Sequence, residues 1–81
     1  MVNKLTLIKR STPICPMCLK MQVVLDEEGV TYDTIDITTD VEAIEKYNIS
    51  SVPVILINDG DTEIRLNGFQ PIEVIKELLE D

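Results

Sequence analysis

The chain contains two cysteines, Cys15 and Cys18, which stand three positions apart with a proline and a methionine between them. Residues at positions i and i+3 of a helix have Cβ atoms about 5–6 Å apart, and a disulfide requires Cα atoms about 4.4–6.8 Å apart. A helix that begins at this pair therefore lets the two thiols form and open a disulfide with little movement of the backbone. The Cys15-Pro16-Met17-Cys18 segment predicts thiol–disulfide exchange, which needs no cofactor beyond the disulfide itself.

Pro16 indicates where this helix begins. A proline suits the first helical turn, because its missing N–H would have had no partner within the helix there. We therefore expect Cys15 at the N-cap, exposed to solvent, and Cys18 one turn into the helix and half-buried. The partial positive charge of a helix N-terminus stabilises a thiolate, and cysteines in CxxC motifs so placed have pKa values below that of free cysteine. The hypothesis is that Cys15 attacks a substrate disulfide and Cys18 resolves the mixed disulfide.

Other side chains near the cysteines have more modest expected roles. Met17 stands between the two cysteines and offers no charge, and we expect it, like Met21, to serve packing. Three of the seven basic residues stand close to the motif: Lys9, Arg10 and Lys20. One hypothesis is that they lower the pKa of Cys15 or steer an acidic partner. The other is that each is a solvated surface charge.

Composition limits the class of protein. A chain of 81 residues has room for one modest core, so we expect a single domain over residues 1–81. The 44% hydrophobic and 27% charged residues are typical of a soluble globular protein. Nucleic acid is not an expected partner at a net charge of −8. The apolar runs are too short to span a membrane, and the first residues lack the apolar stretch of a signal peptide. We therefore expect a cytoplasmic monomer.

Seven segments carry a strand or helix pattern that would position the cysteines. In chain order they are a strand at 4–9, a helix from Cys15 to Gly29, a strand at 31–37, a short helix ending at Asn48, a fully buried strand at 54–57, an edge strand at 62–66 after a turn at 58–61, and a helix with Pro71 at its first position.

The short central helix has its own start signal. Thr39 and Glu42 fit a capping box, with Thr39 at the N-cap and Glu42 at the third helical position. We expect this helix to direct three side chains inward: Val41, Ile44 and Tyr47.

Two motifs on this frame resemble the thioredoxin/glutaredoxin superfamily. The cysteine segment after the first strand resembles its active site, and Ser51-Val52-Pro53 before the third strand resembles its cis-proline loop. The resemblance implies an α/β, thioredoxin-like fold of order β-α-β-α-β-β-α. Its mixed four-stranded sheet would have strand order 2-1-3-4 and three flanking helices, the first and third on one face and the second on the other. It also implies a cis peptide bond at Pro53.

The same resemblance suggests how substrate binds. Ser51, Val52 and Pro53 would form the binding loop, with the backbone of Val52 pairing with the substrate chain as a short strand. Gly68 and Phe69 would flank the same groove.

Which branch of the superfamily the chain resembles predicts the electron donor that would reduce its disulfide. The length, and the proline after the first cysteine, resemble a glutaredoxin. Glutaredoxins typically carry a lysine where Thr12 stands, and a Gly-Gly-acidic segment that grips glutathione where residues 67–71 read Asn-Gly-Phe-Gln-Pro. Gly-Phe-x-Pro resembles small glutaredoxin-like redoxins that donate electrons to ribonucleotide reductase and are recharged by thioredoxin reductase. The resemblance thus implies a dithiol electron carrier that reduces protein disulfides.

Three alternatives remain open at this stage. The first is a glutathione-dependent glutaredoxin. The second is a protein that binds Cu(I) or an iron–sulfur cluster through the CxxC pair, although Pro13 stands where soft-metal chaperones carry a methionine, and their βαββαβ order disagrees with a helix at 40–47. A structural zinc site is not expected, because two cysteines without a histidine cannot supply four ligands. The third alternative is a non-catalytic module that binds partners through its groove.

Overall fold

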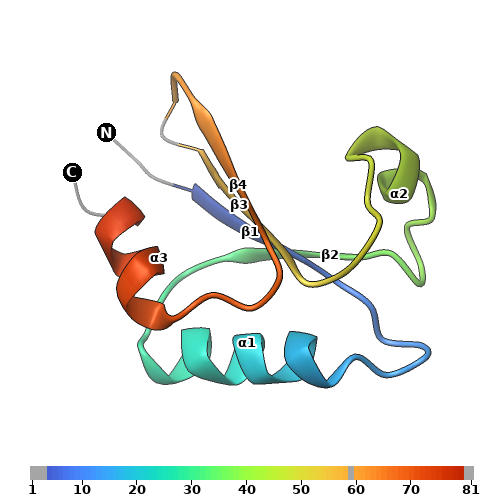
Figure 1. Cartoon of the computed structure of the whole chain (residues 1–81), viewed down its shortest axis with the longest axis horizontal. Coiled ribbons are helices and arrows are strands. Elements are labelled where there is room, and N and C mark those ends of the chain that lie inside the picture. The colour runs from blue at the N-terminus through green and yellow to red at the C-terminus, as the bar shows by residue number, and fades with distance from the viewer. Residues whose placement is uncertain (1–3, 59, 80–81) are drawn as a thin grey trace.

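Four strands and three helices make up the part of the chain that the computed structural model describes, residues 4–58 and 60–79 (Figure 1). In chain order they are β1 (Lys4–Lys9), α1 (Pro16–Glu27), β2 (Asp33–Asp36), α2 (Glu42–Lys46), β3 (Val54–Asn58), β4 (Glu63–Asn67) and α3 (Ile72–Leu79). No helix among these is long and apolar enough to cross a membrane.

The strands form one mixed sheet in the order β2-β1-β3-β4. β1 runs parallel to β2 and antiparallel to β3, and β3 runs antiparallel to β4. The first four residues of β3, Val54 to Ile57, are at most 5% exposed, because Ile55 and Ile57 lie in the larger core cluster and Val54 and Leu56 in the smaller one on the other face. The predicted thioredoxin-like topology and the predicted buried strand are confirmed.

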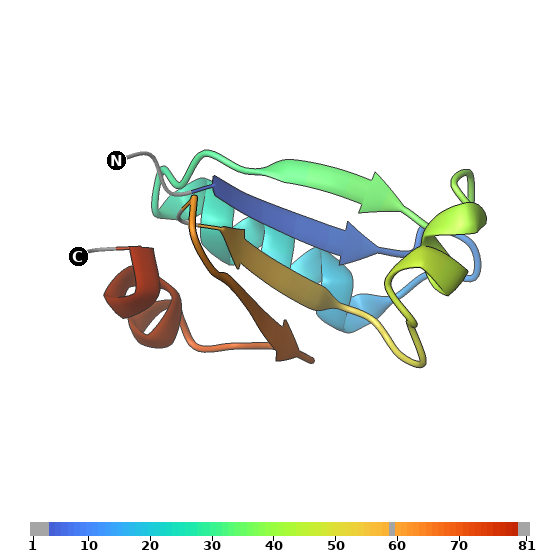
Figure 2. The same ribbon diagram turned by 90° about the horizontal axis from the view of Figure 1, so that it is seen from above.

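Helices cover both faces of the sheet (Figures 1 and 2). On one face, Met21 and Leu25 of α1 and Ile75 of α3 pack with β1 and β3 residues in the larger core cluster. On the other face, a smaller cluster beneath α2 is built around Ile8 and Val54. The helices are thus distributed as the resemblance implied, and β1 delivers the chain from the middle of the sheet into α1.

The start of α2 differs from the prediction. Thr39 does not cap the helix: its hydroxyl donates to the carbonyl of Asp36 at 3.2 Å, within the turn that follows β2. Val41 occupies the N-cap without a side-chain hydrogen bond. Val41 and Ile44 are 62% and 40% exposed, and Ala43 is the buried residue instead. The capping-box prediction and the inward orientation of Val41 and Ile44 are therefore wrong, because the hydroxyl has a competing local acceptor and a five-residue helix presents barely one turn to the sheet.

The helix ends match the sequence signals. Gly29 follows α1 in the left-handed conformation, with φ of +71°, and the N–H of Val30 donates to the carbonyl of Leu25 at 3.0 Å, as in a Schellman motif. Asn48 ends α2 in the same conformation, with φ of +53°. Both stop signals are confirmed.

Other boundaries shift by one or two residues. β2 covers only the middle of the predicted strand at 31–37, and β4 begins and ends one residue later than predicted. Pro71 lies at the N-cap position rather than at the first helical position, because its carbonyl accepts the N–H of Val74 at 3.1 Å. In the turn at 58–61, Asp59 lies outside the described residues, as do the first three residues of the chain.

Candidate active site

Cys15 and Cys18 form a disulfide at the start of α1, with Cα atoms 5.2 Å apart. Cys15 is the N-cap, in an extended conformation, and Pro16 begins the helix. The backbone N–H of Cys18 donates to the Sγ of Cys15 at 3.2 Å, and the N–H of Leu19 donates to the Cys15 carbonyl at 3.1 Å. One N–H of the first helical turn is thus directed at the sulfur that the hypothesis makes the nucleophile, where it would stabilise negative charge.

Both sulfurs are less accessible than predicted. Cys15 is 5% exposed and Cys18 is 1% exposed, so the expectation of an exposed Cys15 and a half-buried Cys18 is wrong for this oxidised state. The cause is local: the Sγ of Cys15 turns back over the first turn of α1 to meet the N–H and the sulfur of Cys18. The surface around the disulfide is apolar, because Ile14 and Met17 are 65% and 43% exposed. Met17 therefore does not pack in the core as predicted, whereas Met21 does.

The loop before Cys15 is tied down by two side chains. Arg10 donates from Nε to the carbonyl of Pro13 at 2.9 Å. The hydroxyl oxygen of Thr38, beyond the end of β2, accepts the N–H groups of Ser11 and Thr12 at 3.1 and 3.0 Å and donates to the Thr12 carbonyl at 3.2 Å. The Thr12–Pro13 peptide bond is cis. Sequence reasoning missed Thr38, because its partners lie 26 and 27 positions away.

Asp36 stabilises the hydrogen-bonded contact between Thr38 and the loop before Cys15. Its carboxylate accepts the N–H of Thr38 at 2.9 Å. Hydrogen bonds from the Ser11 side chain and then from the Thr38 backbone hold the pKa of Asp36 below its ordinary value. The end of β2 and the loop before Cys15 are therefore joined through a carboxylate and a hydroxyl.

The Ser51–Pro53 loop lies at the start of β3, and its Val52–Pro53 peptide bond is cis, as the resemblance implied. Pro53 is buried, Val52 is half-buried and Ser51 is exposed. The carbonyl of Pro53 accepts the N–H of Gly68 at 2.8 Å, which fixes the loop to the segment that follows β4. Gly68 has φ of +88°, a conformation that favours glycine.

A small pocket opens beside this loop, with a volume of about 90 Å³. Its walls come from the loop, from α2 and from the segments after β1 and β2, and its lining residues are Arg10, Ile37, Ile44, Ile49, Ser50, Ser51 and Val52. The isoleucines make it apolar, with Arg10 as the charged side chain of the lining. Such a pocket suits an aliphatic group held next to a chain that pairs with Val52.

Phe69, for which the sequence left a core position and a groove position equally open, lies partly in the core, and Lys20 contacts its ring. Phe69 is half-buried and packs against the larger core cluster. The ammonium nitrogen of Lys20 lies over its ring, 5.1 Å from the centroid. Neither residue lines the small pocket, and Lys9 lies at the end of β1, outside that lining as well.

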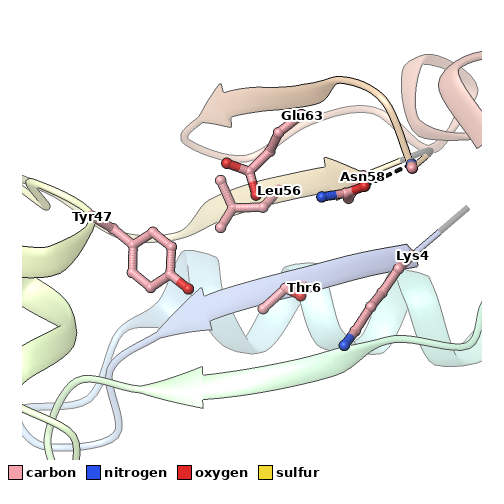
Figure 3. A pocket seen from close by; sticks show the side chains of 7 residues that line it. Lys4, Thr6, Tyr47, Leu56, Asn58 and Glu63 are labelled. Carbon is pink, nitrogen blue, oxygen red and sulfur yellow. Dashed lines mark hydrogen bonds between the residues drawn. The ribbon is translucent and has the colours of Figure 1, made fainter.

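A larger hollow of about 490 Å³ lies on the sheet face that carries α2 (Figure 3). Its lining includes Lys4, at the end of β1 that is remote from Cys15, together with Thr6, Tyr47 and Glu63. It contains neither cysteine, and among residues 4–58 and 60–79 no three histidine, cysteine or acidic side chains gather to hold a metal ion. The dithiol and the small pocket, rather than this hollow, form the candidate active site.

A disulfide at a helix N-terminus and a cis-proline loop, both at the same end of a 2-1-3-4 sheet because Ile8 of β1 pairs with Val54 of β3, define a thioredoxin-fold thiol–disulfide oxidoreductase. The element order also differs from the βαββαβ order of soft-metal chaperones. The glutaredoxin family model matches residues 6–61, and the chain belongs to the glutaredoxin family.

Relatives with known names agree with this assignment. The SPbeta prophage-derived thioredoxin-like protein YosR of Bacillus subtilis (strain 168) is 34% identical over 77 residues, which cover 93% of this chain and 95% of that protein. A glutaredoxin from Archaeoglobus fulgidus is 28% identical, with a TM-score of 0.73 over 96% of this chain and 87% of that one. A chloroplastic thioredoxin z, at 22% identity, shares the fold with a TM-score of 0.76, covering 96% of this chain and 75% of that one.

Proposed function

We propose that this protein is a dithiol redoxin that reduces disulfide bonds in other proteins and is recharged by a thioredoxin reductase. The observation that carries the proposal is the Cys15–Cys18 disulfide at the helix N-terminus, together with a cis-proline loop and its apolar pocket at the same end of the sheet. A disulfide bond of ribonucleotide reductase is the kind of substrate that such a redoxin would reduce. The cytoplasm is the compartment in which we propose that it acts.

The proposed reaction passes two electrons to the substrate. The Cys15 thiolate attacks one sulfur of the substrate disulfide, forming a mixed disulfide and releasing the first substrate thiolate. Cys18, which loses its proton, then attacks the Sγ of Cys15. The Cys15–Cys18 disulfide closes and the second substrate thiolate leaves. Protonation of the two leaving thiolates completes the reduction. The N–H of Cys18, 3.2 Å from the Cys15 sulfur, supports the assignment of Cys15 as the attacking group.

Protein substrates are favoured over glutathione by the surroundings of the disulfide. Glutathione carries two carboxylates and one ammonium group, whereas Ile14 and Met17 present apolar surface and the small pocket is lined largely by isoleucines. The segment at 67–71 contains no carboxylate to hold an ammonium group. The Gln70 side chain in that segment donates to the carbonyl of Asn67 at 3.1 Å.

Two reducing systems distinguish the donors. The protein would be assayed for reduction of insulin and of a small mixed disulfide, once with NADPH and thioredoxin reductase and once with NADPH, glutathione and glutathione reductase. Turnover with thioredoxin reductase alone is the expected result. Turnover only with glutathione would make the protein a glutathione-dependent glutaredoxin, and no turnover with either would refute the enzymatic proposal.

Serine variants test the two cysteine roles. Cys15→Ser should abolish turnover, because no nucleophile remains at the helix N-cap. Cys18→Ser should retain the first attack and accumulate the mixed disulfide with substrate, detectable by its mass under non-reducing conditions. Activity in Cys15→Ser, or a mixed disulfide on Cys18 in place of Cys15, would reverse the assigned roles.

A further inference from the structure

Lys20 links the helix of the dithiol to the segment after β4. It lies on α1 two positions beyond Cys18, and its ammonium nitrogen is 5.1 Å from the centroid of the Phe69 ring. A cation over an aromatic face at this distance is attracted by the ring. The ring itself packs against the larger core cluster, so it offers the ammonium a fixed surface. The segment after β4 leaves the sheet on the side of α1 and α3, as Figure 1 shows.

The contact continues toward the substrate loop through the backbone. Gly68 precedes Phe69, and its N–H donates to the carbonyl of Pro53 at 2.8 Å. Pro53 follows Val52, whose backbone the resemblance to the thioredoxin/glutaredoxin superfamily suggests as the partner of the substrate chain. A physical path therefore runs from the helix that carries the cysteines to the cis-proline loop, through Lys20, Phe69, Gly68 and Pro53.

We propose that Lys20 is a positioning residue: its ammonium, seated on the Phe69 ring, stabilises the Gly68–Pro53 hydrogen bond and so keeps the substrate-binding loop aligned with the disulfide. The proposal rests on the proposed function and on the expectation, from the resemblance, that the backbone of Val52 pairs with substrate. In this proposal the charge of Lys20 acts on the position of the substrate-binding loop. The hypothesis drawn from the sequence was instead that this charge lowers the pKa of Cys15.

The expected effect is modest and measurable. A cation–π contact at an exposed site contributes about 0.5–1 kcal/mol, and 1.4 kcal/mol corresponds to a factor of ten. Loss of the charge should therefore raise the opening of the Gly68–Pro53 hydrogen bond about two- to fivefold.

The test compares Lys20→Met, which keeps the aliphatic stem, with Lys20→Arg, which keeps a cation on the ring. In Lys20→Met, amide hydrogen exchange at Gly68 should accelerate about two- to fivefold, and KM for a protein disulfide should rise by a similar factor with kcat unchanged. Lys20→Arg should restore both quantities. The pH dependence of Cys15 alkylation should be the same in all three proteins, whereas a direct effect of Lys20 on the thiolate would shift it.

A matched control and a double variant complete the test. Lys46 makes the same kind of contact with Tyr47, at 5.3 Å, so Lys46→Met should leave Gly68 exchange unchanged. Phe69→Leu should accelerate exchange, and adding Lys20→Met to it should have no further effect. The proposal is refuted if Lys20→Met leaves Gly68 exchange or KM at the wild-type value, or if Lys46→Met changes exchange equally. Gly68 exchange tests the linkage even if the protein lacks reductase activity, so failure of the proposed function would be recognised separately.

Discussion

Reduction of the Cys15–Cys18 disulfide should lower the free energy of unfolding by about 2 kcal/mol. The two cysteines are three positions apart, so the disulfide closes a loop of only four residues. In the chain-entropy model, closing n residues removes about 2.1 + 1.5R ln n cal/mol/K from the unfolded chain, which for this short loop is about 6 cal/mol/K, or about 1.9 kcal/mol at 25 °C. For a domain of this size, such a difference corresponds to a melting temperature lower by about 8–15 °C.

The fold around the disulfide should change little on reduction. Cys15 and Cys18 are already held one helical turn apart, with Pro16 at the start of α1. The N–H of Cys18 donates to the Cys15 sulfur, and this hydrogen bond is available to a thiolate as well as to a disulfide. The stability difference between the two redox states should therefore come mainly from the unfolded chain.

Equilibrium unfolding in urea, with and without dithiothreitol, measures this difference. The chain has no tryptophan, so far-ultraviolet circular dichroism is the suitable signal. The double variant Cys15→Ser/Cys18→Ser should unfold at the same urea concentration with and without dithiothreitol, which controls for effects of the reductant itself. A reduced wild-type protein as stable as the oxidised one, or more stable, would refute the reasoning, because it would show that the folded state opposes the disulfide.

Two further predictions concern the loop before Cys15. Thr38→Val removes three hydrogen bonds to Ser11 and Thr12 and should cost about 1–2 kcal/mol in urea unfolding, given about 0.5–1.5 kcal/mol per net hydrogen bond and the exposure of this loop; Thr39→Val, which loses one, should cost less. Because hydrogen bonds from Ser11 and Thr38 lower the pKa of Asp36 in the folded protein, its stabilisation is present above the unfolded-state pKa and is lost as the pH falls through the folded-state pKa. Asp36→Asn should therefore lose less stability than the wild-type protein as the pH falls below about 4. If the free energy of unfolding falls equally in both proteins over this pH range, Asp36 makes no such contribution.

The features that the sequence predicted correctly depend on neighbouring residues. Pro16 starts α1 and Gly29 ends it, because each residue fixes its own backbone conformation. The apolar run of β3 indicated a strand covered on both faces, since no residue from Val54 to Ile57 offers a polar side chain to solvent. The pairing of a CxxC segment with a downstream Val-Pro then identified the fold, and with it the cis bond at Pro53.

The features that escaped prediction depend on distant partners or on side-chain direction. Thr38 acts on the loop before Cys15 across 26 positions, and no local pattern shows that β2 ends beside that loop. Thr39 fitted a capping box, but its hydroxyl donates to the carbonyl of Asp36 within the turn after β2. Cys15 was expected to be exposed from its place at the start of the helix; in the disulfide its Sγ lies against the first turn of α1, where the N–H of Cys18 donates to it.

Charge provides an independent reason to favour a protein partner over glutathione. The chain carries fifteen acidic and seven basic residues, so an anionic tripeptide meets net repulsion as it approaches. A cationic side chain at the site would offset this repulsion, but Thr12 stands where glutaredoxins typically carry a lysine, and Lys20 lies over Phe69. Arg10 lines the small pocket and keeps its charge while its Nε donates to the Pro13 carbonyl, so it is the cationic side chain that this pocket offers against the net negative charge of the chain. In the proposed function, affinity at this site would come from apolar burial and from strand pairing at Val52, which a protein chain supplies better than a short anionic peptide does.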